Sequence, residues 1–326
     1  MFTKTFLKLF PPPKFLDIHY SGLDISDDAI RCVDFVDNQK HLSIHKYGFK
    51  PLPPNTIESG TIKNKEVLIK ALTDFREEMG IYTVKVSLPE ERIYLFKTEI
   101  FSTNEQEIKQ SIEFKLEENV PLSVSEAIFF FDIIPSSLED EDRRFASVSV
   151  APRELVMSYL EVLKSAGLSA ISFEVQAKAC AHSLVEINSK GTVIIVNIME
   201  HKSGVYIVCE RTVCFTSTIP WGRKTMEDSK DLSSTIEELK RELTRVNSYW
   251  VLHGHGTIIS KIILSGRGAL FQGLVSDCSP DGKITAEIGR VWQNAFSVDK
   301  YIPPIHFEDS LDYAVASGLA LPRSLT

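Results

Sequence analysis

Two hairpin-like stretches carry the residue types best suited to holding a phosphate. In the first, residues 22–26 (Gly-Leu-Asp-Ile-Ser) and 29–35 form two short strands around a tight polar turn, and Asp24 is carried into that turn. A similar pattern returns downstream, where 193–199 and 205–209 flank a second polar turn. Two such hairpins that face each other across a cleft can grip the phosphates of ATP through backbone N–H groups and a carboxylate.

The elements that must position these hairpins follow each of them in the same order. Each hairpin is succeeded by a third strand, a helix and a closing strand. These segments are 41–47, 64–80 and 84–88 in the first unit, and 212–219, 232–253 and 261–265 in the second. Asp24 lies 60 positions before Val84, and Asn197 lies 65 before Ile262. The matching order and spacing indicate an internal repeat; the alternative is chance agreement between ordinary α/β segments.

A segment of different character separates the two units. Residues 91–167 read as an α+β insert, with strands at 92–100, 127–134 and 145–150, a helix at 104–118, and a second helix that starts at Pro152 and ends near Gly167. A charged loop at 138–144 carries no evident chemistry. The predicted organisation is an N-terminal segment at 1–19, a first half at 20–90, 168–190 and 313–326, the insert at 91–167, and a second half at 191–312.

Composition excludes several classes of protein. The chain of 326 residues is 43% apolar and 25% charged, as expected for a soluble globular protein, and its net charge of −8 argues against nucleic-acid binding. No apolar run is long enough to span a membrane. The five cysteines form no CxxC pair, which predicts reduced, buried thiols. His253 and His255 lack a third ligand nearby and indicate an exposed loop, and no G-x-S-x-G motif supports a hydrolase.

The first ten residues could form a short amphipathic helix. Phe2, Phe6 and Leu9 share one face of that helix, and lysines lie on its polar side. Peripheral contact of residues 1–10 with a membrane surface is one interpretation, and packing against the body or a partner is the other. No small-residue cleavage site follows, so a secretion signal is not indicated.

Four motifs, in order along the chain, resemble the PilM family, actin-like proteins of type IV pilus assembly that are related to the division protein FtsA. These are Gly-Leu-Asp-Ile-Ser at 22–26, Leu-Pro-Glu-Glu-Arg-Ile-Tyr-Leu-Phe at 88–96, Ile-Glu-Phe-Lys-Leu-Glu-Glu-Asn-Val-Pro at 112–121 and Phe-Thr-Ser-Thr-Ile-Pro at 215–220. The resemblance extends from about Gly22 to Leu321. It implies an α/β fold of the actin-like (ribonuclease H-like, duplicated) type, with 91–167 as an inserted SHS2-type subdomain.

The resemblance also implies a cellular location and binding partners. Family members lie at the cytoplasmic face of the inner membrane and bind the N-terminal tail of the membrane protein PilN. The expected role is a scaffold that links this tail to the pilus motor ATPase. We expect the tail to bind by strand addition or in apolar pockets, first of all near 92–100 and 105–118. Trp221 and Phe129–Phe131 are either interface anchors or core residues.

An actin-like site implies ATP and Mg²⁺, but several of the expected groups are replaced. The resemblance places Asp24 at the first acid, with Ser26 in the position of a glycine. In the second hairpin Asn197 replaces the acid and Met199 replaces the glycine, which removes a charge and adds bulk where a phosphate should approach.

The other two parts of the site are a third acid and an adenosine turn. Gln176 stands where the third acid belongs, although a two-residue shift of the alignment would place Glu174 there. The adenosine turn is the best preserved part, with Gly266 and Gly268 after an apolar strand.

These replacements predict weak or absent binding of ATP and Mg²⁺ and little or no hydrolysis. An acid that helps hold the metal is worth a few kcal/mol, so its loss weakens affinity or rate about a hundredfold. One alternative is an active ATPase of the same machinery, in which the loop cradles phosphate by its backbone alone. A second is an FtsA-like division filament, against which the lack of an amphipathic tail in 319–326 counts.

Overall fold

The computed structural model describes most of the chain. The described residues are 18–38, 41–134, 144–229, 232–253, 258–279, 282, 284–322 and 324–325. Three sequence-based expectations lie outside them: the amphipathic helix at 1–10, nearly all of the charged loop at 138–144, and the loop that contains His255.

The first half is built on a five-stranded sheet. Its strands are β1 (Ser21–Ile25), β2 (Ala29–Asp37), β3 (Leu42–Pro51), β6 (Thr83–Leu88) and β10 (Ser169–Val175), in the order β10-β6-β1-β2-β3. Between β3 and β6 come a small hairpin, β4 (Ile57–Glu58) with β5 (Thr61–Ile62), and helix α2 (Lys65–Met79). Helix α2 begins and ends as predicted, because the Asn64 side chain accepts the Val67 N–H and Gly80 adopts a left-handed conformation.

The second half repeats this arrangement strand for strand. Its strands are β11 (Thr192–Ile198), β12 (Ser203–Cys209), β13 (Thr212–Ile219), β14 (Ile259–Ser265) and β15 (Thr285–Ile288), in the order β13-β12-β11-β14-β15. In both sheets the first three strands are antiparallel and the last two run parallel to the first. The predicted internal repeat is therefore confirmed as a repeated topology.

The second half contains four helices among the residues that the structure describes after β13. They are α6 (Arg223–Asp228), α7 (Leu232–His253), α8 (Leu274–Asp277) and α9 (Phe307–Ser310), with short 3₁₀ turns η4 (Arg267–Leu270) and η5 (Leu311–Tyr313). Helix α7 packs Leu239, Leu243 and Val246 into the core of the second sheet.

The inserted segment forms its own small sheet. Strands β7 (Tyr94–Ile100), β8 (Ala127–Ile133) and β9 (Arg144–Pro152) pair in the order β7-β9-β8, and α3 (Glu105–Asn119) covers one face of this sheet. A short 3₁₀ turn, η2 (Glu90–Arg92), links β6 to β7.

The next helix, α4 (Arg153–Ser165), contributes its buried side chains to the core of the first half. It buries Tyr159 and Leu163 in the core of the first sheet, so we propose to draw the inserted unit as 94–152.

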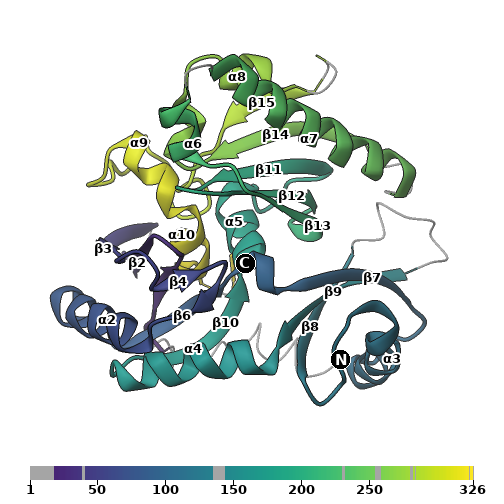
Figure 1. Cartoon of the computed structure of the whole chain (residues 1–326), viewed down its shortest axis with the longest axis horizontal. Coiled ribbons are helices and arrows are strands. Elements are labelled where there is room, and N and C mark those ends of the chain that lie inside the picture. The colour runs from purple at the N-terminus through teal and green to yellow at the C-terminus, as the bar shows by residue number, and fades with distance from the viewer. Residues whose placement is uncertain are drawn as a thin grey trace.

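Two helices lie between the sheets of the two halves, as Figure 1 shows. They are α5 (Gln176–Leu184) and α10 (Ala314–Ala320), which pack closely on each other; α10 also packs on β1, and α5 on β13. A Cβ added to Gly318 would lie 1.8 Å from the Ala179 carbonyl oxygen, and one added to Gly22 would lie 2.1 Å from that of Ala316. Only glycine permits this approach, and it fixes the two hairpins in place relative to each other.

All five cysteines lie among the described residues and none forms a disulfide; four are buried and Cys214 is half-buried. Among the described helices, none combines the length and the apolar character needed to cross a bilayer.

Candidate nucleotide cleft

The tips of the two hairpins meet at a narrow cleft between the halves. Several predicted site residues line it: Asp24, Ser26, Asn197, Met199 and Gly266. Arg31, Glu200, Arg223 and Asp312 line it as well, and the sequence interpretation did not include them. The cleft has a volume of about 20 Å³, which is room for a single water molecule, whereas small-molecule sites occupy on the order of 300–1,000 Å³.

Asp24, the first acid, is buried, and one oxygen of its carboxylate is engaged within the protein. Its Oδ1 accepts a hydrogen bond from Ser87 Oγ at 2.7 Å and one from Gln176 Nε2 at 3.2 Å. Burial raises the pKa of Asp24, and the nearby Arg31 charge opposes that rise. Internal donors therefore hold and orient one of the two oxygens that could coordinate a metal ion.

Arg31 is the cation of this site, and it lies directly opposite Asp24 in the β1–β2 ladder. Its guanidinium donates to Ser26 Oγ at 3.2 Å and to Asp28 Oδ2 at 3.1 Å. Although burial opposes the effect, the Arg31 charge holds the pKa of Asp28 below its usual value. A two-residue hairpin turn pairs positions 24 and 31, so this register was the signal by which the sequence could have revealed Arg31.

The second hairpin carries no charge at the equivalent positions. Asn197 pairs with Gly204 on β12, where the first hairpin has Asp24 and Arg31. The Met199 N–H donates to the Lys202 carbonyl inside the turn, and the Met199 carbonyl accepts the N–H of Arg223 at 2.8 Å. This turn therefore uses its backbone groups to hold the start of α6, and the Met199 N–H is not available to a phosphate.

The position of the third acid is occupied by an amide. Gln176, the first residue of α5, reaches Asp24, and its Oε1 is buried without a hydrogen-bond partner. Glu174 lies 3.0 Å from His182 Nδ1 instead, and although burial opposes the effect, this contact lowers the pKa of Glu174. The alignment shifted by two residues would therefore place at this position an acid that lies against His182.

The glycine turn has a structural explanation of its own. Gly266 has a φ of +81°, and a Cβ there would lie 1.9 Å from the Ile198 carbonyl oxygen. Gly268 lies outside the described lining of the cleft, and its Cβ would meet Ile198 Cγ2 at 2.3 Å. Both glycines let this turn pack against the end of β11, so their presence does not by itself indicate adenosine binding.

An ion-pair cluster joins the two hairpin tips, and we call it the clasp: Lys202 with Asp27 and Glu91. Lys202 Nζ lies 2.9 Å from Asp27 Oδ2 and also contacts Glu91 Oε1. Although burial opposes the effect, the two carboxylates raise the pKa of Lys202 and keep it charged. No sequence pattern indicated the clasp, because its members lie far apart along the chain.

Outside the narrow cleft the two halves form a wider mouth of about 450 Å³, whose described lining includes Arg31, Phe49, Arg223 and Arg267. Each of its three arginines contacts a carboxylate: Asp28, Glu200 and Asp312 respectively. The mouth therefore has room for a ligand, but each acid in its described lining is already paired with a cation. Taken together, these residues do not fit a triphosphate with Mg²⁺ in the arrangement that the structure shows.

Glu90 is a second buried acid near the cleft. Its Oε2 accepts the Ala177 N–H at 3.0 Å at the start of α5, and it also interacts with Thr216 on β13 of the second half. Burial raises the pKa of Glu90 to about 7. This side chain therefore connects the central helix to the second sheet and titrates near neutral pH.

Comparisons with known proteins agree with this architecture. Residues 22–231 match a family model described as type IV pilus assembly protein PilM. A solved PilM–PilN type IV pilus biogenesis complex contains a chain with a TM-score of 0.76 and 18% identity, covering 93% of this chain and 98% of that one. No curated protein sequence matches.

Two further structures are similar at a TM-score of 0.51 and 12% identity. One is the ethanolamine utilization protein EutJ from Carboxydothermus hydrogenoformans, covering 95% of this chain and 90% of that one. The other is the cytoplasmic domain of EpsL, an inner-membrane component of the Vibrio cholerae type II secretion system, covering 94% and 98%. At such identities the likeness concerns the fold, and the predicted actin-like α/β fold is confirmed.

Proposed function

The chain belongs to the family of type IV pilus assembly proteins PilM, and we propose that it acts in that machinery as a scaffold and not as an ATPase. The observation that carries this proposal is the state of the cleft. Ser87 and Gln176 hold Oδ1 of Asp24 in the first hairpin, the counterpart of this acid is Asn197, and the clasp joins the two tips. A scaffold needs the rigid frame that such contacts provide.

The partner we propose is the N-terminal tail of a PilN-like inner-membrane protein. The similar structure of a PilM–PilN complex, which aligns with 93% of this chain, supports this choice. In this role the protein works at the inner face of the cytoplasmic membrane and connects the tail to the pilus motor ATPase.

We place the tail along β8, not along β7 as the sequence suggested. We prefer β8 because β7 lies beside β13 of the second half. Strand β8 is an edge of the small sheet, and among the described residues it pairs only with β9. Its Phe129, Phe130 and Phe131 are all half-buried.

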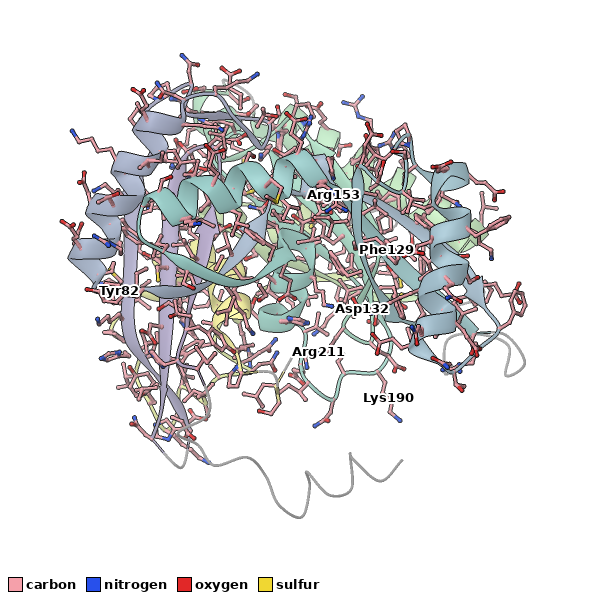
Figure 2. All side chains as sticks on the ribbon, turned by 90° about the horizontal axis from the view of Figure 1, so that it is seen from below. Tyr82, Phe129, Asp132, Arg153, Lys190 and Arg211 are labelled. Atoms are coloured by element: carbon pink, nitrogen blue, oxygen red, sulfur yellow. The ribbon has the colours of Figure 1, made fainter. Side chains whose placement is uncertain are left out.

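An apolar strand at an open sheet edge is a template for another strand, and natural proteins usually protect such edges. Figure 2 looks at the face where Phe129 and Asp132 of β8 lie. Asp132 is held by Lys178 of α5 at 2.7 Å, which anchors β8 to the first half. An extended tail can therefore add to β8 by backbone hydrogen bonds and place its apolar side chains on the half-buried phenylalanines.

A binding measurement with matched variants tests this placement. Ile133→Lys puts a charge at the exposed end of β8, and Phe114→Lys puts one on the exposed face of α3; both side chains are solvent-exposed in the wild type. We expect Ile133→Lys to weaken the binding of a synthetic PilN tail by about tenfold or more, as measured by calorimetric titration, and Phe114→Lys to leave it unchanged. The reverse pattern would move the site to α3.

A second measurement tests the absence of turnover. We expect titration of MgATP into the wild-type protein to give binding weaker than micromolar and no phosphate release. Lys202→Ala opens the clasp, so it should strengthen MgATP binding while leaving phosphate release undetectable, because Gln176 supplies no acid to orient water. Micromolar binding with turnover in the wild type would instead establish the active ATPase.

A further inference from the structure

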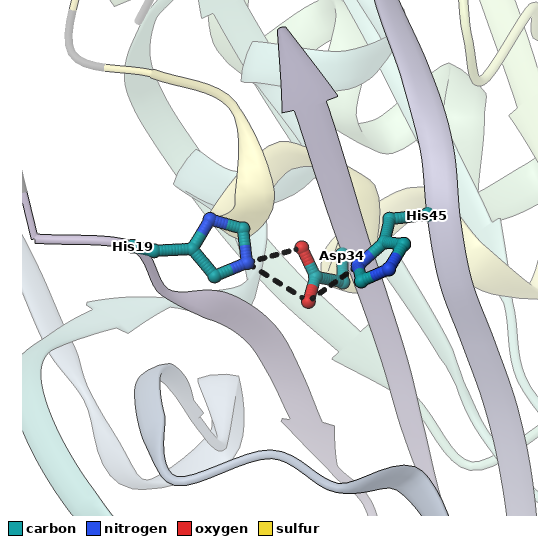
Figure 3. A group of neighbouring side chains, drawn as sticks. All are labelled: His19, Asp34 and His45. Carbon is teal, nitrogen blue, oxygen red and sulfur yellow. Dashed lines mark hydrogen bonds and ion pairs between the residues drawn. The ribbon is translucent and has the colours of Figure 1, made fainter. Parts of the chain in front are cut away.

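A cluster of two histidines and an aspartate lies on the first sheet, away from the nucleotide cleft. It consists of His19 just before β1, Asp34 on β2 and His45 on β3, and the three side chains converge as Figure 3 shows. Asp34 is three residues beyond Arg31 on β2, about 10 Å along the strand and on its other face. The cluster is therefore independent of the cleft.

The ligand atoms are already at distances that a metal ion can bridge. His19 Nε2 lies 2.9 Å from Asp34 Oδ1, His45 Nδ1 lies 3.7 Å from Asp34 Oδ2, and one ligand atom from each residue lies within 4.8 Å of the others. Two ligands of a tetrahedral Zn²⁺ ion are separated by about 3.3 Å, between these two values. Asp34 is buried, while both imidazoles are exposed and accessible to an ion from solvent.

A β-bulge directs the third ligand into the cluster. Asp34 pairs with Lys46 and Phe35 pairs with Ile44, which leaves His45 as the extra residue of β3. In a regular strand, neighbouring residues point to opposite faces, so His45 would face away from Asp34. The bulge turns His45 toward Asp34, and bulges commonly redirect side chains at functional positions.

A hydrogen bond from a neighbouring serine orients the carboxylate. Ser21 Oγ donates to Asp34 Oδ2 at 3.3 Å, which orients the acid from inside the sheet. Lys46, the nearest cation on this face, is directed elsewhere, because its ammonium donates to the Met79 carbonyl at 2.8 Å.

We propose that His19, Asp34 and His45 form a binding site for a divalent transition-metal ion of the Zn²⁺ class. Two imidazoles and one carboxylate are a ligand set that Zn²⁺ and similar ions accept, with a water molecule in the fourth position. A bound metal ion would connect His19, which lies just before β1, to β2 and β3. The site is a binding site only; its residues lie outside the cleft and take no part in the proposed scaffold contacts on β8.

Calorimetric titration of the untagged full chain with ZnCl₂ tests the proposal. We expect one equivalent to bind, and His19→Ala and His45→Ala each to weaken binding by about a hundredfold. Ser21→Ala should weaken it by about tenfold through loss of the hydrogen bond to Asp34. His306→Ala, an exposed histidine at the start of α9, should leave the affinity unchanged.

Titration with Co²⁺ adds a readout of the ligand type. Absorption typical of nitrogen and oxygen ligands, with no thiolate charge-transfer band, is expected in the wild type and should be lost in the His19→Ala/His45→Ala variant. Undiminished binding in either single histidine variant, a thiolate band, or no binding below millimolar Zn²⁺ would overturn the assignment. Neither the Zn²⁺ titration nor the Co²⁺ titration depends on binding of the PilN tail. The metal-site proposal and the tail-binding proposal can therefore be disproved independently of each other.

Discussion

The two hairpins occupy equivalent places in the two repeated sheets, but only the first carries charged residues at the equivalent paired positions. In the first, Asp24 faces Arg31 across the ladder, and the serine on the adjacent parallel strand, Ser87, donates to the acid. In the second, Asn197 faces Gly204, and the serine on the adjacent parallel strand, Ser265, donates to the Leu311 carbonyl instead. The first half thus places a cation and a hydrogen-bond donor beside its acid, whereas the second half has no acid at the equivalent position.

The proposed scaffold role interprets this difference as two routes away from nucleotide chemistry within one fold. A metal-binding acid has to be buried enough to be directed and free enough to coordinate. Asp24 is directed by two hydrogen bonds to its Oδ1, and Asn197 never carries the charge. If neither position 24 nor position 197 binds a metal ion, contacts across the cleft can stabilise the closed arrangement of the two halves, as the clasp does.

Removal of the buried cation should give the largest effect. We expect Arg31→Ala to lower the free energy of unfolding by about 3–5 kcal/mol, because it leaves Asp28 and Asp24 buried without their counter-charge. The matched change in the second hairpin, Asn197→Ala, removes an uncharged amide and should lower it by about 1 kcal/mol. Urea denaturation of both variants measures the difference, and equal losses would show that the two hairpins do not differ in charge pairing.

The buried acid that joins the halves should give the next largest effect. Because the pKa of Glu90 is raised to about 7 in the folded state, from about 4.5, this group favours folding below about pH 4.5. Its contribution is lost as pH rises through about 7, and amounts to about 3 kcal/mol. We expect Glu90→Gln to flatten the fall in melting temperature between about pH 4.5 and pH 7, the interval between the two pKa values, and an unchanged fall would mean that Glu90 is not responsible.

Partial restoration of the second hairpin should give the smallest effect. The double change Asn197→Asp with Met199→Gly recreates an Asp-x-Gly turn there, but Asp24 stays engaged and the clasp stays closed. We therefore expect MgATP affinity to rise less than tenfold, with no phosphate release. A strong gain in affinity from this change alone would show that the residue types at 197 and 199, and not the contacts of the first half, keep nucleotide out.

Much of the fold could be predicted because its signals are local. The ends of α2 follow from Asn64 and Gly80, and the repeat follows from strands and helices in matching order. The neighbour of β7 could not be predicted, because alternation along a strand does not reveal that β13 lies beside it. The role of α4 in the first core was missed for the same reason, since its apolar face fits either sheet.

The sequence by itself determined which residue types stand at the hairpin tips, including the uncharged pair Asn197 and Met199, because those types need no partner to be identified. Only the tertiary structure decided what each of them meets. Ser87 reaches Asp24 across 63 positions, Gln176 across 152, and Lys202 reaches Glu91 across 111. The first two contacts depend on the crossover connections that bring β6 and the start of α5 beside β1, and the third depends on how the two halves pack together; no local pattern in the chain encodes that geometry.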